Sequence, residues 1–160
     1  MKTIFDDVSN DCSKIVTKTY STSFSLATKM LSKGIRQHIY NIYGFVRFAD
    51  EIVDSFHDYD KEALFKDFSS DLEKSLKNKI HLNPILNSFQ ATYHKFNIDK
   101  DLVDSFMSSM KKDLYKTKYL SNQEYEDYIY GSADVVGLMC LKVFVNGDSK
   151  KYEELKSFAM

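Results

Sequence analysis

The segment IRQHIYNIYGFVRFADEIVDSF, residues 35–56, is the strongest indication of the fold of this 160-residue chain. At about 100° per residue, its apolar side chains surround most of a helix and leave one narrow polar stripe. That stripe consists of Arg36, Tyr40, Tyr43, Arg47, Asp50 and Asp54. Since a helix that is apolar around most of its circumference must be covered by other elements, the segment predicts the centre of a helical bundle.

The rest of the composition also favours helices. One Pro and five Gly argue against a loop-rich all-β chain, and no segment shows the sustained alternation of a strand. Helix start signals recur, with Asp60, Asn83, Asp99 and Asp148 each opening a segment and Ser121 beginning a capping box. We expect a single all-α domain over residues 1–160, with helices at 7–19, 24–31, 35–57, 61–78, 84–96, 100–117, 122–145 and 149–160.

Charge and cysteine content exclude several classes of protein. Twenty-two basic and twenty-three acidic side chains give a net charge of −1, which argues against nucleic-acid binding. Acidic Asp6 and Asp7 stand where a signal peptide would be apolar. Cys12 and Cys140 are too few for a disulfide scaffold. We therefore expect a cytoplasmic protein with both thiols reduced and packed.

The polar stripe differs from an ordinary solvated face. It is narrow, and it carries Tyr, Arg and Asp instead of Lys and Glu. The chain has twenty Lys but only two Arg, and both lie on the stripe. Because the planar guanidinium suits phosphate and carboxylate recognition, the stripe indicates a functional cavity. A buried structural ion pair is the alternative.

Two acids of the stripe suggest a metal. Asp50 and Asp54 are four residues apart, so their carboxylates project side by side. Repulsion between them would raise one pKa unless a cation lay between them. One or two carboxylates, completed by water and substrate phosphates, describe a Mg²⁺ site. The spacing alone is a weak signal, since such pairs also arise by chance.

Two further segments are unusual. Small residues crowd the segment at Gly131, Ser132, Ala133 and Gly137, which indicates either close helix packing or room for a ligand. The hydroxyls of residues 21–23 either cap a helix or, with free backbone N–H groups, bind a phosphate.

Three sequence blocks follow one another along the chain. They are Y-S-T-S-F at Tyr20–Phe24, Y-x-x-x-R-x-x-D-E-x-x-D at Tyr43–Asp54, and Y-x-Y-G-x-A-x-x-V-G at Tyr128–Gly137. Together they resemble the squalene/phytoene synthase family of head-to-head prenyl transferases. The resemblance implies an isoprenoid-synthase-type helical bundle that uses Mg²⁺ to condense two farnesyl or geranylgeranyl diphosphates in squalene or carotenoid biosynthesis.

The resemblance also implies roles for individual residues. Asp50 and Asp54 match the first aspartate-rich metal site, and Arg47 matches a diphosphate contact. Tyr43 and Tyr128 match cavity tyrosines near the reacting carbons. The remaining expected substrate contacts are Tyr20, Ser21, Thr22, Ser23, Phe24, Ser132 and Val136. NADPH is needed only if the product is squalene, and lipid substrates allow a peripheral contact with membranes.

Some features depart from the family pattern. Glu51 replaces an Asp, and Asp134 stands in the third block, where we expect it to pair with a neighbouring side chain. The family's second aspartate-rich block, with nearby Gln and Asn, has no counterpart before Met160. We therefore expect the chain to be the truncated N-terminal part of a longer prenyl-synthase domain, inactive alone.

Two other interpretations remain open. Asp54 and His57 have the carboxylate-x-x-His spacing of di-iron bundles, although no second copy of that motif exists. His57 is otherwise a helix C-terminal or solvent residue. The second interpretation is a non-catalytic helical interaction or scaffold domain derived from the family.

Overall fold

The computed structural model describes residues 1–115 and 121–160, and every regular element among them is a helix. The helices are α1 (Lys2–Tyr20), α2 (Thr22–Lys29), α3 (Lys33–Asp54), α4 (Lys61–Asn78), α5 (Pro84–Lys95), α6 (Lys100–Asp113), α7 (Asn122–Ile129), the π-helix η1 (Tyr130–Asp134), α8 (Val135–Phe144) and α9 (Ser149–Ala159). The all-α prediction is confirmed.

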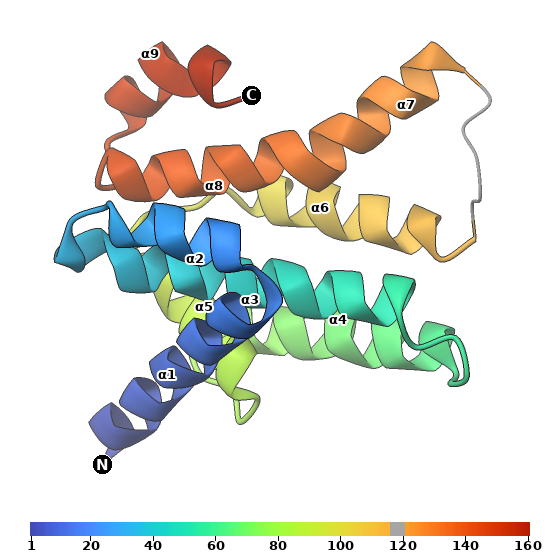
Figure 1. Ribbon diagram of the computed structural model, residues 1–160, viewed down its shortest axis with the longest axis horizontal. Coiled ribbons are helices and arrows are strands. Elements are labelled where there is room, and N and C mark those ends of the chain that lie inside the picture. The colour runs from blue at the N-terminus through green and yellow to red at the C-terminus, as the bar shows by residue number, and fades with distance from the viewer. Residues whose placement is uncertain (116–120) are drawn as a thin grey trace.

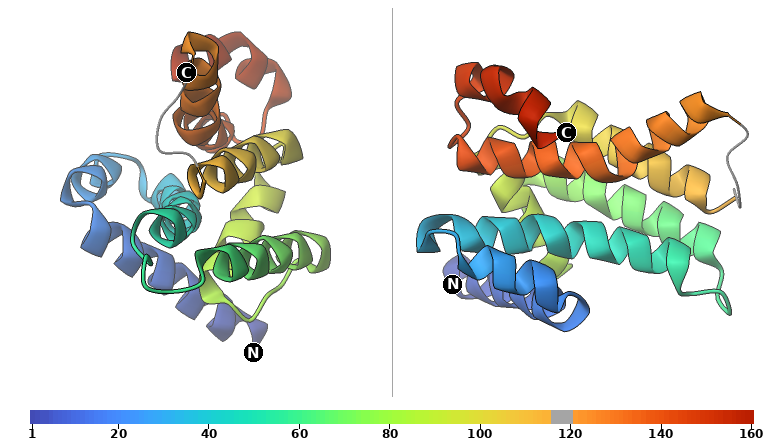
Figure 2. Two further views of the ribbon diagram at one scale, coloured as in Figure 1. Left: turned by 90° about the vertical axis from the view of Figure 1, so that its right-hand side faces the viewer. Right: turned by 45° about the horizontal axis from the view of Figure 1, so that its top comes forward.

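Helix α3 lies at the centre of the bundle, as its apolar circumference predicts. It contacts α1, α2, α4 and α5 on one side and α6 and α8 on the other (Figures 1 and 2). Phe45 of α3 has no exposed surface. Its ring stacks on Phe89 of α5 at 4.2 Å between centroids and meets Phe106 of α6 edge-on at 5.4 Å. These aromatic contacts join both sides of the bundle through one residue.

Helix starts follow the capping signals in the sequence. Asp60, Asn83, Ser121 and Asp148 each accept a backbone N–H from the first turn of the following helix. Asp99 precedes α6 without such a bond, although the helix begins where predicted. Helix α1 starts at Lys2 instead of residue 7, and α6 ends at Asp113 instead of 117. Residues 116 and 117 of that predicted helix lie outside the described part of the chain.

The predicted helix over 122–145 is wrong in one respect, because it is not a uniform α-helix. Helix α7, η1 and α8 follow one another as a single bent rod (Figure 1). The π-helical turn coincides with the small-residue block, and π-turns inside α-helices frequently mark functional sites. The sequence gives no direct signal for the wider hydrogen-bond register.

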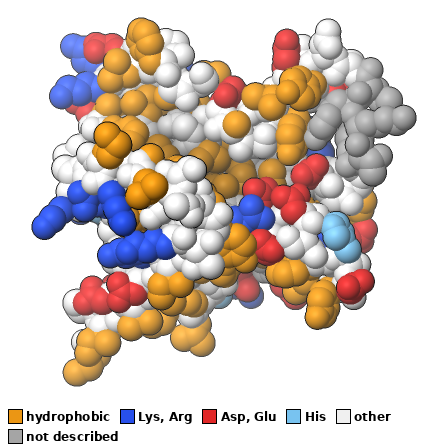
Figure 3. Space-filling view, viewed as in Figure 1, with side chains coloured by type: hydrophobic (Ala, Val, Ile, Leu, Met, Phe, Trp, Pro, Cys, Tyr) orange, Lys and Arg blue, Asp and Glu red, His pale blue; other side chains and the backbone are white. Residues whose placement is uncertain are grey.

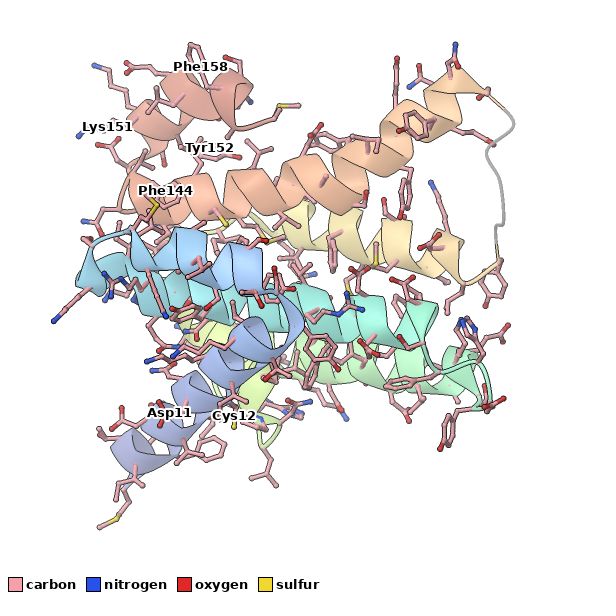
Figure 4. All side chains as sticks on the ribbon, viewed as in Figure 1. Asp11, Cys12, Phe144, Lys151, Tyr152 and Phe158 are labelled. Atoms are coloured by element: carbon pink, nitrogen blue, oxygen red, sulfur yellow. The ribbon has the colours of Figure 1, made fainter. Side chains whose placement is uncertain are left out.

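Two glycines of this rod serve close helix packing. A Cβ on Gly131 would overlap the Ser109 hydroxyl of α6, and one on Gly137 would lie 2.5 Å from the Ala159 carbonyl oxygen of α9. Of the two explanations for the small residues, close packing therefore holds at both positions. Figure 4 shows Tyr152 of α9 pointing toward α8, where the ammonium of buried Lys142 lies 4.1 Å from its ring centroid.

The two cysteines agree with the sequence-based expectation of reduced thiols. Cys12 and Cys140 are free thiols, and burial raises the pKa of Cys140 to about 12. Among the described residues, no helix is both long enough and apolar enough to span a bilayer.

Candidate functional site

The polar stripe of α3 divides into two parts with different roles. Its N-terminal part is structural, which corrects the prediction of one continuous functional stripe. The Arg36 guanidinium donates to the carbonyl oxygens of Leu31 at 2.8 Å and Lys29 at 2.6 Å, so it stabilises the end of α2. Tyr40 is only 3% exposed and belongs to the core. The candidate site is therefore the C-terminal part, from Tyr43 to Asp54.

Arg47 lies at the centre of this C-terminal part. Its Nη2 donates to Glu51 Oε2 at 3.0 Å, and its Nη1 lies 3.7 Å from Asp50 Oδ2. Glu51, which replaces an Asp of the family pattern, is thus an ion-pair partner of Arg47. The Arg47 Nε is buried and has no hydrogen-bond partner in the part of the chain that the structure describes. A buried donor left unpaired is unfavourable, so this atom indicates a place where a bound anion would be favourable.

Aromatic side chains of α1 and α2 contact this part of the stripe at Arg47 and Tyr43. The Cζ atom of Arg47 lies 5.2 Å from the ring centroid of Tyr20, at the end of α1. Phe24 of α2 stacks on Tyr43 of α3 at 4.7 Å between centroids. The α1–α2 turn therefore brings the first sequence block onto the second.

The hydroxyls of the first block have separate roles. Ser21 accepts the Phe24 backbone N–H at 3.1 Å, so its side chain caps α2. Thr22 and Ser23 are exposed in the first turn of that helix, where hydroxyl and backbone donors are available to an anion. The capping explanation is therefore confirmed for Ser21, and the phosphate-binding expectation stays a prediction for Thr22 and Ser23.

The two aspartates of the stripe, Asp50 and Asp54, repel each other. Burial and the neighbouring Asp54 charge raise the pKa of Asp50 to about 6, against the opposing influence of Arg47. Asp50 keeps 34% of its side chain exposed, and Asp54 is exposed at the end of α3. A carboxylate held in this way gains from a nearby cation, which is the behaviour expected of a cation ligand.

Asp113 is a third carboxylate here, and the sequence analysis missed it. It comes from α6, and burial together with the Asp54 charge raises its pKa, whereas a hydrogen bond with Tyr128 lowers it. Asp113 also raises the pKa of Asp50. The residue thus connects the aspartates of α3 with the tyrosine of α7. Its sequence neighbours Lys111 and Lys112 made it look like an ordinary surface acid.

Figure 3 shows acidic side chains gathered at the front of the molecule between α3 and α6. The packing of Gly131 against Ser109 of α6 explains how Tyr128 reaches them. Ser109 precedes Asp113 by one helical turn, and Gly131 follows Tyr128 by nearly one turn. The close contact between Gly131 and Ser109 therefore sets the register of the two helices that brings Tyr128 to Asp113.

The other third-block residues lie farther along the rod. Ser132 donates its hydroxyl to the Tyr128 carbonyl oxygen at 2.7 Å, and Val136 packs half-buried against the core. Asp134 has no hydrogen bond or ion pair with any described residue, so the expected pairing is wrong. His57 is exposed, with its Nδ1 3.2 Å from Lys61 Nζ, as expected of a solvent residue.

The carboxylates of the stripe fit a Mg²⁺ site in which the substrate supplies some of the ligands. Among residues 1–115 and 121–160, no group of three His, Cys, Asp or Glu forms a complete cage for an ion. Mg²⁺ commonly takes only one or two carboxylates and completes its shell with water and phosphate oxygens. Asp50 and Asp54 provide that pair of carboxylates, beside an arginine that suits a phosphate.

The chain is similar in sequence to phytoene synthases. The chain is 30% identical over 129 residues to phytoene synthase 3 of Zea mays, covering 80% of this chain and 30% of that protein. It is 27% identical over 128 residues to phytoene synthase of Arthrospira platensis, covering 80% of this chain and 41% of that protein. The chain thus spans less than half the length of these curated relatives.

Solved structures share the fold. A dehydrosqualene synthase bound to a ligand superposes with a TM-score of 0.83 at 21% identity, covering 96% of this chain and 52% of that chain. Squalene synthase HpnC from Alicyclobacillus acidocaldarius superposes equally well, at 0.83 and 20% identity, covering 98% of this chain and 59% of that chain. The sequence profile of squalene/phytoene synthase matches residues 17–159. With all three blocks inside that match and the bundle shared, the chain belongs to the squalene/phytoene synthase family.

Proposed function

We propose that a longer protein containing this chain condenses two prenyl diphosphates head to head, with Mg²⁺ as cofactor. Farnesyl or geranylgeranyl diphosphate would be the substrate, and a squalene- or phytoene-type hydrocarbon the product. The observation that carries the proposal is that Arg47 lies against both the Asp50 carboxylate and the Tyr20 ring of α1, with the Asp54 charge close enough to act on Asp50. Family membership supports the class of reaction.

The residues of the site suit departure of a diphosphate. When bound between Asp50 and Asp54, Mg²⁺ would neutralise charge that develops on the leaving group. The unpaired Nε of Arg47 is a donor for a phosphate oxygen, and Thr22 and Ser23 would add hydroxyl donors at the start of α2. Preorganised donors of this kind stabilise the transition state more than the ground state.

The aromatic residues suit the cationic part of the substrate. Tyr43 is held in place by its stack on Phe24, and Tyr128 by its hydrogen bond with Asp113. Ring faces attract a cation, and an aromatic lining keeps water from an allylic cation. We assign both tyrosines to the region of the reacting carbons, with Ser132 and Val136 farther along the prenyl chain. NADPH would be needed only if the product is squalene.

The chain alone holds one of the family's two aspartate-rich blocks, and we propose that it does not turn over alone. The test is to supply Mg²⁺ with farnesyl or geranylgeranyl diphosphate and to analyse C30 and C40 hydrocarbons by gas chromatography and mass spectrometry. We expect product from the longer protein and none from residues 1–160. Asp50→Asn and Asp54→Asn should each lower kcat/KM at least about 10²-fold, whereas Asp67→Asn on the exposed face of α4 should not.

A different result would favour the non-catalytic scaffold. If the longer protein yields no hydrocarbon and Mg²⁺ with inorganic diphosphate leaves its thermal stability unchanged, the proposed reaction is wrong. Product from residues 1–160 alone would contradict only the expected inactivity of this part.

A further inference from the structure

A basic groove lies between α1, α2 and the beginning of α3. It has a volume of about 490 Å³, and its lining has no acid among residues 1–115 and 121–160; the lining consists of Lys14, Lys18, Lys29, Lys33, Arg36, Gln37 and Tyr40. Arg36 and Arg47 are eleven residues apart, so the groove lies about 16 Å along α3 from the centre of the candidate site. Figure 3 shows the Lys and Arg side chains of this region together at the left of the molecule.

The floor of the groove is held rigidly, whereas its lysines are free. Arg36 is fixed by the carbonyl oxygens at the end of α2. Gln37 Nε2 donates to the Asn10 carbonyl oxygen at 2.8 Å and to Asn41 Oδ1 at 2.9 Å. The lining contains four lysines, which are Lys14, Lys18, Lys29 and Lys33. None of these lysines forms an ion pair with an acid among the described residues. These ammonium groups therefore remain available to an external anion.

Exposed apolar side chains border the groove. Met30, at the tip of the α2–α3 turn, is 88% exposed, and Leu26 is 57% exposed. Leu26 lies one helical turn before Lys29 and Met30, so these three side chains share a face. On α1, Ile15 is 62% exposed and lies one turn before Lys18. A soluble phosphate needs only the cations, whereas a bilayer surface offers anionic phosphates together with an apolar layer just beneath them.

From this combination we propose that the groove is a docking surface for an anionic phospholipid bilayer. The lysine ammonium groups contact lipid phosphates, while Met30 and Leu26 enter the headgroup layer. Asp11 is the nearby opposing charge, one turn before Lys14 on α1 and pointing away from α2 in Figure 4. This role is independent of the proposed reaction, because none of the four lysines belongs to the candidate site.

Vesicle sedimentation with matched variants tests the proposal. The groove variant replaces Lys14, Lys18, Lys29 and Lys33 by Gln. The control variant replaces Lys66, Lys74, Lys77 and Lys151 by Gln, which are exposed lysines elsewhere with the same total change in charge. Circular dichroism checks that both variants fold. The vesicles are phosphatidylcholine alone or phosphatidylcholine with phosphatidylglycerol.

We expect the protein to bind only the vesicles that contain phosphatidylglycerol. At about 1 kcal/mol per lysine near such a surface, the groove variant should partition on the order of 10²- to 10³-fold more weakly. The control variant should change much less. Met30→Ser, which leaves the charge unaltered, should weaken binding severalfold, and about 0.5 M salt should largely abolish it.

Three outcomes would overturn the proposal. One is equal binding to both kinds of vesicle, and another is an equal loss in the groove and control variants. The third is saturable binding of inorganic diphosphate that requires the four groove lysines, with no binding to phosphatidylglycerol vesicles. That result would make the groove a site for a soluble phosphate.

Discussion

Replacing Asp50 by Asn should stabilise the folded chain at neutral pH, because folding places this carboxylate in unfavourable surroundings. Burial and the Asp54 charge raise its pKa from 3.8 to about 6. At about 1.4 kcal/mol per unit, the full shift corresponds to roughly 3 kcal/mol. Since 34% of the side chain is exposed, solvent screening reduces the expected gain to about 1–2 kcal/mol.

The pH dependence has a definite sign. The folded state binds the Asp50 proton more tightly than the unfolded state, so protonation favours folding. That favourable contribution is complete below pH 3.8 and is lost as the pH rises through about 6. Asn does not titrate, so Asp50→Asn should be more stable at pH 7.5, and less than half of that gain should remain at pH 4.5.

Urea unfolding followed by circular dichroism at the two pH values measures this difference. Asp67→Asn on α4 is the control and should show no comparable change in stability at pH 7.5. If Asp50→Asn is instead less stable at pH 7.5, the ion pair with Arg47 outweighs burial and repulsion. The stripe would then be a structural ion pair, and the reasoning that makes Asp50 a cation ligand would be refuted.

Three further substitutions test the site and its packing. Gly131→Ala should cost about 1–3 kcal/mol in urea unfolding because its Cβ would overlap Ser109, whereas Gly34→Ala, with nothing within 4 Å, should be neutral or slightly stabilising. Ser21→Ala should lower the free energy of unfolding by about 0.5–2 kcal/mol through loss of the α2 cap; equal stability to Thr22→Ala would contradict the capping role. Arg47→Lys in the longer protein should lower kcat/KM by about 10²-fold, because an ammonium cannot reproduce the planar contacts with Asp50 and Glu51. Unchanged steady-state kinetics would remove Arg47 from the proposed chemistry.

Long-range contacts explain why the sequence analysis did not predict Asp113 as a residue of the site. Asp113 follows two lysines in the last turn of α6, and no local pattern separates it from a surface acid. It joins the site because α6 packs beside η1 and brings the carboxylate to Tyr128. The opposite error concerns Arg36 and Tyr40, which share the polar stripe in a helical projection. Arg36 donates a hydrogen bond to a carbonyl oxygen of the α2–α3 turn, and Tyr40 is buried in the core.

The helical class, the central place of α3, most helix starts and the family can all be predicted from the amino-acid sequence. These features depend on periodicity, capping and short motifs, which act over a few residues and are therefore visible along the chain. The division of the stripe into two parts, the π-turn in the rod and the position of Asp113 near Asp54 and Tyr128 become visible in the folded chain alone. Each of those features depends on which helices touch, because side-chain burial and charge interactions arise between segments far apart in the chain.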